Sequence, residues 1–273
     1  MNYRYIFVLV GALVTILVIR QLTQPKIIFT CTTFFDFAKM DRWASFQRAI
    51  TEFYRLNQDV GKITTWLIVN EYSETPKADW AKIMRETFPQ MTFIQKNKDQ
   101  KGQAASLNIV LDHIKPYTYW IQWEDTWFPE HGFLGRAIDI MNNSSVSQLQ
   151  FTKLNGKVNW LDIPQDRQLR QSTPGGSQYI VVKAVPDIQS TLQNSPYEFR
   201  SSWRSSWPLF SLLPSINRVS HLSTLGQFST DPKLWPVKFE WDYARRWYTA
   251  GGKKAVLPDG PVIREGHVST YSK

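Results

Sequence analysis

Glu124 and Asp125 form the only adjacent pair of acidic residues in this 273-residue sequence. The pair follows an apolar run, 118–123, and has tryptophans on both sides, Trp123 and Trp127. Carboxylate oxygens at the end of a buried strand are suited to bind a divalent cation, and such a cation could bind a phosphate. The same pair could also be a solvated turn, with Asp125 as a helix cap.

A second group of charged residues lies near the C-terminus, in the segment Phe239–Tyr248. This segment is predicted to be helical, because its apolar residues recur at helical spacing and glycines follow it at Gly251 and Gly252. Glu240 and Asp242 fall in its first turns, where acids also favour a helix electrostatically. The arginines that follow could simply form a solvated helix face.

Strands and helices alternate through the first half of the chain. Apolar, β-branched runs predict strands at 26–33, 63–70, 91–95 and 118–123. Helical patterns predict helices at 41–58, 77–88, 103–114 and 132–142. This order favours an α/β fold, a Rossmann-type, mostly parallel sheet with flanking helices. Such sheets bind ligands at the carboxyl ends of their strands, where three polar pairs fall: Thr32-Thr33, Asn70-Glu71 and Glu124-Asp125.

The second half is less regular, with strand-like segments at 147–152, 178–184 and 253–257. No clear linker separates the halves, so we expect a single catalytic domain, 26–273. Its first half, 26–143, would bind the substrate that donates a group, and its second half, 144–273, would supply the side that binds the acceptor of that group.

The composition excludes some classes of site. The net charge is +9, but the basic residues are dispersed, so nucleic acid is not an expected partner. Cys31 is the only cysteine, which excludes an intrachain disulfide and cysteine-based metal sites. The 12 tryptophans could be core residues or platforms for sugar rings.

Residues 1–25 predict a membrane anchor. The segment 6–19 is almost wholly apolar and lies between Arg4 and Arg20. Its length suits a short transmembrane helix or the core of a cleaved signal peptide, and we favour an uncleaved signal anchor because no cleavage site is convincing. The remainder would then be lumenal, where Asn142 and Asn143 stand in glycosylation sequons.

The order of these motifs resembles that of the GT-A-fold glycosyltransferases, especially the inverting family 2 type. The resemblance rests on four segments over about residues 26–271: the Leu107-Asn108 pair in a helix of small residues, the strand ending in Glu124-Asp125, the spacing from Glu240 to Arg246 and Gly251, and a late His267. It implies a nucleotide-sugar donor and a glycan or glycoconjugate acceptor. A short tail, one anchor and a lumenal domain also resemble Golgi-type or large-virus glycosyltransferases.

The resemblance also implies roles for single residues. Glu240 would be the catalytic base, with Asp242 as second choice. Asp125 and His267 would bind Mn²⁺ or Mg²⁺. The donor would be bound by residues from both halves: Thr32, Asn70, Glu71, Gly102, Asn108, Glu124 and Arg246. The family often has a third acid where this chain has Thr126, which puts the metal affinity in doubt.

We therefore expect a membrane-anchored, inverting, metal-dependent glycosyltransferase. Its localisation would be that of a single-pass type II protein with a Golgi- or ER-like lumenal domain, or the equivalent compartment of a virus-infected host. One alternative is a membrane-tethered glycan-binding protein on a degenerate transferase fold, which Thr126 motivates. Another is a metal-dependent phosphohydrolase or nucleotidyltransferase, which would leave the Glu240 motif unexplained.

Overall fold

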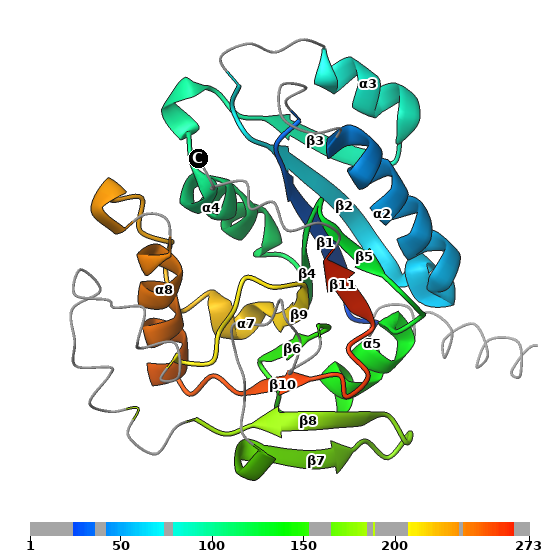
Figure 1. The fold of residues 1–273 in the computed structure, drawn as a ribbon, viewed down its shortest axis with the longest axis vertical. Coiled ribbons are helices and arrows are strands. Elements are labelled where there is room, and N and C mark those ends of the chain that lie inside the picture. Colours follow the sequence, from blue (N-terminus) through cyan, green and yellow to red (C-terminus); the bar gives the residue numbers. More distant parts are fainter. Residues whose placement is uncertain are drawn as a thin grey trace, which may run out of the picture.

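The computed structural model describes residues 24–35, 42–73, 79–152, 165–184, 188, 207–234 and 237–264. A nine-stranded sheet runs through the molecule in the order β3-β2-β1-β4-β9-β6-β10-β8-β7 (Figure 1). A separate two-stranded sheet joins β11 to β5. The predicted α/β architecture is confirmed.

The first half of the sheet is parallel and agrees closely with the predicted strands. It contains β1 (Ile27–Thr33), β2 (Ile63–Asn70), β3 (Met91–Gln95) and β4 (Tyr119–Glu124). Buried strands of this kind read as nearly continuous apolar runs, which is why sequence patterning located them. Register places Thr33 opposite Asn70, and Thr32 opposite Glu124, so the polar residues that follow these strands share one edge.

Helices cover both faces of this sheet (Figure 1). One face packs against α2 (Arg42–Leu56), α3 (Trp80–Thr87) and α5 (Leu134–Asn143) in an aromatic-rich core. The opposite face packs against α4 (Gln103–Ile114), α7 (Val219–Leu222) and α8 (Lys238–Thr249). Each strand therefore buries alternate side chains in two different cores.

The second half of the sheet is mixed. Its strands are β6 (Gln148–Gln150), β7 (Gln168–Ser172), β8 (Gln178–Val182), β9 (Ser215–Arg218) and β10 (Lys254–Val256). The antiparallel strand β9 lies between β4 and β6 and joins the two halves. β5 (Trp127–Pro129) and β11 (Val262–Arg264) pair antiparallel, with Arg264 opposite Trp127.

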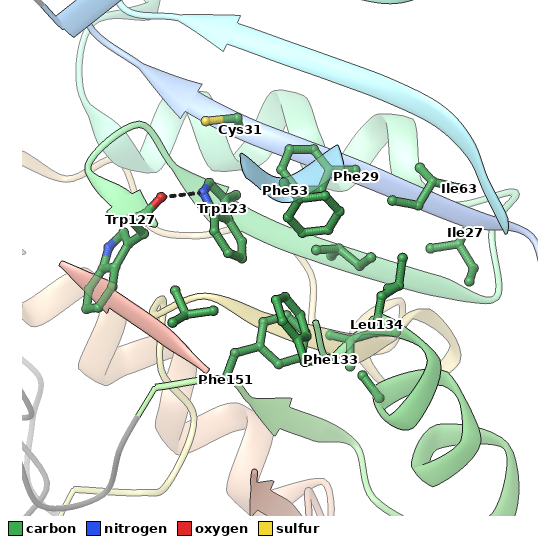
Figure 2. Close-up of a cluster of buried hydrophobic side chains, with 14 of the residues drawn as sticks. Ile27, Phe29, Cys31, Phe53, Ile63, Trp123, Trp127, Phe133, Leu134 and Phe151 are labelled. Carbon is green, nitrogen blue, oxygen red and sulfur yellow. Dashed lines mark hydrogen bonds between the residues drawn. The ribbon is translucent and has the colours of Figure 1, made fainter. Parts of the chain in front are cut away.

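The tryptophans beside the acidic pair are core residues. Trp123 and Trp127 are 1% and 2% exposed, and the indole of Trp123 donates to the carbonyl of Trp127 at 3.0 Å (Figure 2). Phe53 and Phe133 pack against Trp123 from α2 and from the residue before α5. These tryptophans fix the turn that carries Glu124 and Asp125 and do not form a sugar platform.

No helix within the described residues is long and apolar enough to cross a membrane. The predicted anchor at 6–19 lies outside the described residues, so it stays a prediction.

Candidate functional site

Asp125 lies directly after β4 and faces α2. Its side chain is 2% exposed, and a guanidinium nitrogen of Arg42 donates to its two carboxylate oxygens at 3.0 and 3.2 Å. The backbone N–H of Phe34, just after β1, approaches at 3.5 Å. Burial raises the pKa of Asp125 to about 6 despite the opposing charge of Arg42. The predicted metal ligand is thus one half of a buried ion pair.

Glu124 faces the other way, toward α4. One carboxylate oxygen accepts from the side-chain amide of Gln103 at 3.0 Å, and the other accepts from the indole of Trp127 at 3.3 Å. Burial raises the pKa of this partly buried carboxyl, and the nearby positive charge of Arg264 opposes that rise. Thr126 follows as a neutral side chain that is 6% exposed.

Glu71 belongs to a compact polar cluster at the start of α4. The ammonium of Lys96 lies 2.8 and 2.9 Å from its carboxylate oxygens and also donates to the carbonyl of Gly102 and the hydroxyl of Ser106. The N–H of Gly102 donates to Glu71, and Gly102 has φ 102°, a conformation that favours glycine. Glu71 and Gly102 thereby fix the entry into α4.

Asn70 connects three strand ends. Its side-chain oxygen accepts from the Thr33 hydroxyl and the Phe35 N–H, both at 2.9 Å. Its side-chain nitrogen donates to Gln95 at 2.9 Å. Thr32, by contrast, is partly exposed beside Glu124 in the sheet register. Asn70 is therefore satisfied within the protein, and Thr32 is the nearer candidate for a donor contact.

Glu240 lies in the first turn of α8, on the same side of the sheet as Gln103 and α4. Its carboxylate accepts from the backbone N–H of Leu212 at 2.8 Å. Burial, with a smaller contribution from the negative charge of Glu124, raises the pKa of Glu240 to about 7, against the opposing effects of the Leu212 hydrogen bond and the positive charge of Lys254. The structure thus brings Glu240 and Glu124 within electrostatic range of each other, although they lie far apart in the sequence.

Lys254 is a fully buried basic residue of this region. It lies on β10, is 0% exposed, and its ammonium nitrogen has no hydrogen-bond partner among the described residues. Burial lowers its pKa to about 7, while the charge of Glu240 opposes that change.

Three other predicted site residues hold the protein's own chain. Asn108 donates to the carbonyl of Phe228 at 2.9 Å and accepts from its N–H at 2.7 Å. Arg246 bonds the carbonyls of Leu225 and Gln227 and pairs with Asp242 at 3.1 Å. These contacts account for Asn108, Arg246 and Asp242 without a ligand, and their predicted roles in donor binding and catalysis stay predictions.

The described acids do not form a complete divalent-cation site. No group of three or more metal-binding side chains occurs among the residues the structure describes. Asp125 is paired with Arg42, and both carboxylate oxygens of Glu124 accept hydrogen bonds from the protein. His267, the other predicted ligand, lies outside the described residues. The acids among the described residues therefore do not supply the several oxygen ligands that Mn²⁺ or Mg²⁺ prefers.

Sequence comparisons found no matching family model and no matching curated protein. Solved structures do share the fold. A structure of GalNAc-T7 with UDP, GalNAc and Mn²⁺ aligns with a TM-score of 0.57 at 10% identity, covering 92% of this chain and 46% of that chain. The chain has a GT-A fold.

Two further GT-A structures agree. The mannosyltransferase PcManGT from Pyrobaculum calidifontis, in complex with GDP-Man and Mn²⁺, has a TM-score of 0.53 at 14% identity, covering 91% of this chain and 58% of that one. S. aureus TarS 1–349 has a TM-score of 0.52 at 12% identity, covering 86% and 58%. This chain spans about half the length of these GT-A structures.

Sequence reasoning missed the basic residues of the site: Arg42, Lys96, Lys254 and Arg264. No local motif marks them, because each meets its acid only through folding. Lys96 had a weak signal, since it directly follows a predicted strand and precedes the glycine that opens a helix. Arg42 had none, because its partner is 83 residues away.

Proposed function

We propose that this protein is a glycosyltransferase that moves a sugar from a nucleotide-sugar donor to a glycan or glycoconjugate acceptor. The observation that carries the proposal is the position of Glu240 beside β4, at the carboxyl end of a GT-A sheet. Its carboxylate accepts from the N–H of Leu212, and the carbonyl of Leu212 accepts from Gln122, two residues before Glu124. Open α/β sheets bind ligands at this edge. Two of the similar GT-A structures also contain a nucleotide or nucleotide-sugar, UDP and GDP-Man.

Glu240 is the proposed general base. One of its oxygens is fixed by the N–H of Leu212, and the other makes no hydrogen bond to the described residues. The carboxylate would remove the proton of the acceptor hydroxyl as that oxygen bonds to the anomeric carbon. The bond between the anomeric carbon and the diphosphate oxygen breaks, and the nucleoside diphosphate leaves. One base on the face opposite the leaving group gives inversion.

The N-terminal part of the proposal rests on the sequence alone. The apolar run at 6–19 supports a signal anchor, and the catalytic domain would then be lumenal in a type II protein. Both sequon asparagines, Asn142 and Asn143, are exposed at the end of α5. Glycosylation of either would support that placement.

One observation favours a second candidate, a glycan-binding protein without catalytic activity. The pairing of Asp125 with Arg42 and the neutral Thr126 leave the acidic motif without a free acid pair. Glycan binding without any stabilisation by nucleotides would favour this candidate over the enzyme.

Replacing Glu240 with glutamine tests the enzyme. The amide cannot accept the hydroxyl proton, so we expect kcat for sugar transfer or donor hydrolysis to fall about 10²–10⁴-fold. Donor affinity, measured by calorimetry, should stay within about twofold, because the diphosphate contacts are unchanged. Glu86→Gln, on the exposed face of α3, is the matched control and should keep wild-type rates. A loss of donor affinity with unchanged kcat would contradict the assignment.

A further inference from the structure

Both carboxylates of the acidic motif already face a positive charge of the chain itself. Asp125 is paired with Arg42 at 3.0 Å, and their side chains are 2% and 9% exposed. Removing one partner from a buried pair leaves an uncompensated charge, so this pair resists being opened. A cation that needs Asp125 would have to displace Arg42 from inside the core.

The negative charge of Glu124 is offset by the positive charge of Arg264. The antiparallel pairing of β11 with β5 places Arg264 opposite Trp127, three residues after Glu124. Its guanidinium lies 5.8 Å from the centre of the Trp127 ring, and its charge acts on Glu124. Both carboxylate oxygens of Glu124 also accept hydrogen bonds, one from Gln103 and one from Trp127. A divalent cation would therefore have to displace protein partners from both acids.

Arg264 also has an unused donor. Its Nε is buried and has no hydrogen-bond partner within the part of the chain that the structure describes. A buried donor without an acceptor is costly, and a phosphate oxygen is a geometrically suitable acceptor for a guanidinium. The guanidinium is held at the same edge as Glu124 by the Trp127 ring, so it is oriented before any anion arrives.

We propose that the donor diphosphate is bound by Arg264 without a divalent cation. This inference rests on the proposed function and departs from the Mn²⁺ or Mg²⁺ predicted from the sequence. The ligand class is a nucleoside diphosphate, alone or joined to a sugar. Its charge would be met by a fixed guanidinium in place of a metal, a use for which arginine is well suited.

Calorimetric titration of UDP and of GDP into the detergent-solubilised full chain tests this. Each nucleotide is titrated once with EDTA and once with Mn²⁺. We expect at least one to bind in EDTA, with a Kd within about twofold of its value in Mn²⁺. Binding that appears only with Mn²⁺ would overturn the inference and leave the proposed function intact. Absence of binding in both conditions would overturn both.

Variants of Arg264 identify the group that replaces the metal. In EDTA, Arg264→Met should weaken nucleotide binding at least about tenfold, because a charge-assisted contact is lost. Arg264→Lys keeps the charge and should recover part of the affinity. Arg85→Met, on the exposed face of α3, is the control and should bind as the wild type. Wild-type affinity in a folded Arg264→Met protein, judged by its thermal unfolding, would overturn the role of Arg264.

Discussion

Glu240 is the residue on which the proposed chemistry depends most directly. Its carboxyl is held by the Leu212 N–H, faces the negative charge of Glu124 and lies near the positive charge of Lys254. Burial dominates these influences and raises the pKa to about 7. A general base works best when its pKa is near the working pH, so this environment suits the role.

The pH dependence of turnover should report this group. Only the ionised carboxylate accepts a proton, so kcat should rise about tenfold per pH unit below the pKa and level off above about 7. The measurement is the initial rate of donor turnover between about pH 5 and pH 9, a range that covers the acidic limb of the pH–rate profile. A limb near the ordinary value of 4.5 would show that another carboxylate is the base.

Lys254→Met offers a matched test of the same environment. The nearby ammonium favours the charged form of Glu240, so its removal should move the acidic limb to higher pH. An unshifted limb in the folded variant would mean that Glu240 does not control it.

At the level of elements, α4 and α8 are joined through the loop at 225–228. Asn108 on α4 makes two hydrogen bonds to the Phe228 backbone, and Arg246 on α8 bonds the carbonyls of Leu225 and Gln227. The Phe228 ring stacks on Tyr243 of α8 at 3.8 Å. The loop thus fixes the position of α8, which carries Glu240.

Asn108→Ala separates a structural role from donor binding. The variant leaves the N–H and carbonyl of Phe228 without partners, so we expect the free energy of unfolding to fall by about 1–3 kcal/mol. Denaturant unfolding measures the change, and Asn143→Ala, at an exposed position, should cost less. Loss of nucleotide affinity with unchanged stability would instead restore the donor-binding role that the sequence predicted for Asn108.

The elements differ in how far the sequence could predict them. β2 and β3 match their predicted bounds, because each carries a run of apolar and β-branched residues. β7 was missed because four of its five residues are exposed and its one apolar residue stands among polar ones. β9 was missed because it is only four residues long and its sequence contains polar residues. Neither carries an apolar run, and each is defined by its pairing with a neighbouring strand.

The candidate site divides in the same way. The places of Glu124 at the end of a strand and of Glu240 in the first turn of a helix could be predicted, because both patterns are local in the sequence. The partners that decide what Glu124 and Asp125 can bind, Arg264 and Arg42, come from distant segments. The sequence could therefore not show that Asp125 is paired with Arg42, because pairing depends on tertiary packing that no spacing rule records.

At the scale of the whole molecule, the sheet brings two halves to one edge. The parallel strands β1 to β4 place Thr32 and Glu124 there, and β9 connects this half to the strands beneath α8. The GT-A neighbours contain the same fold within longer chains. We propose that this edge binds a nucleotide-sugar.

Thermal unfolding of the solubilised full chain with a panel of nucleotide-sugars tests that claim most directly. A ligand that binds only the folded state stabilises it by about 2.7 kcal/mol at a hundred times its Kd. We expect at least one nucleotide-sugar to raise the Tm by several degrees, roughly the shift that follows from that free energy. We also expect this rise in the Tm to persist in EDTA. If no nucleotide-sugar raises the Tm, with or without Mn²⁺, the protein is not a nucleotide-sugar-dependent transferase.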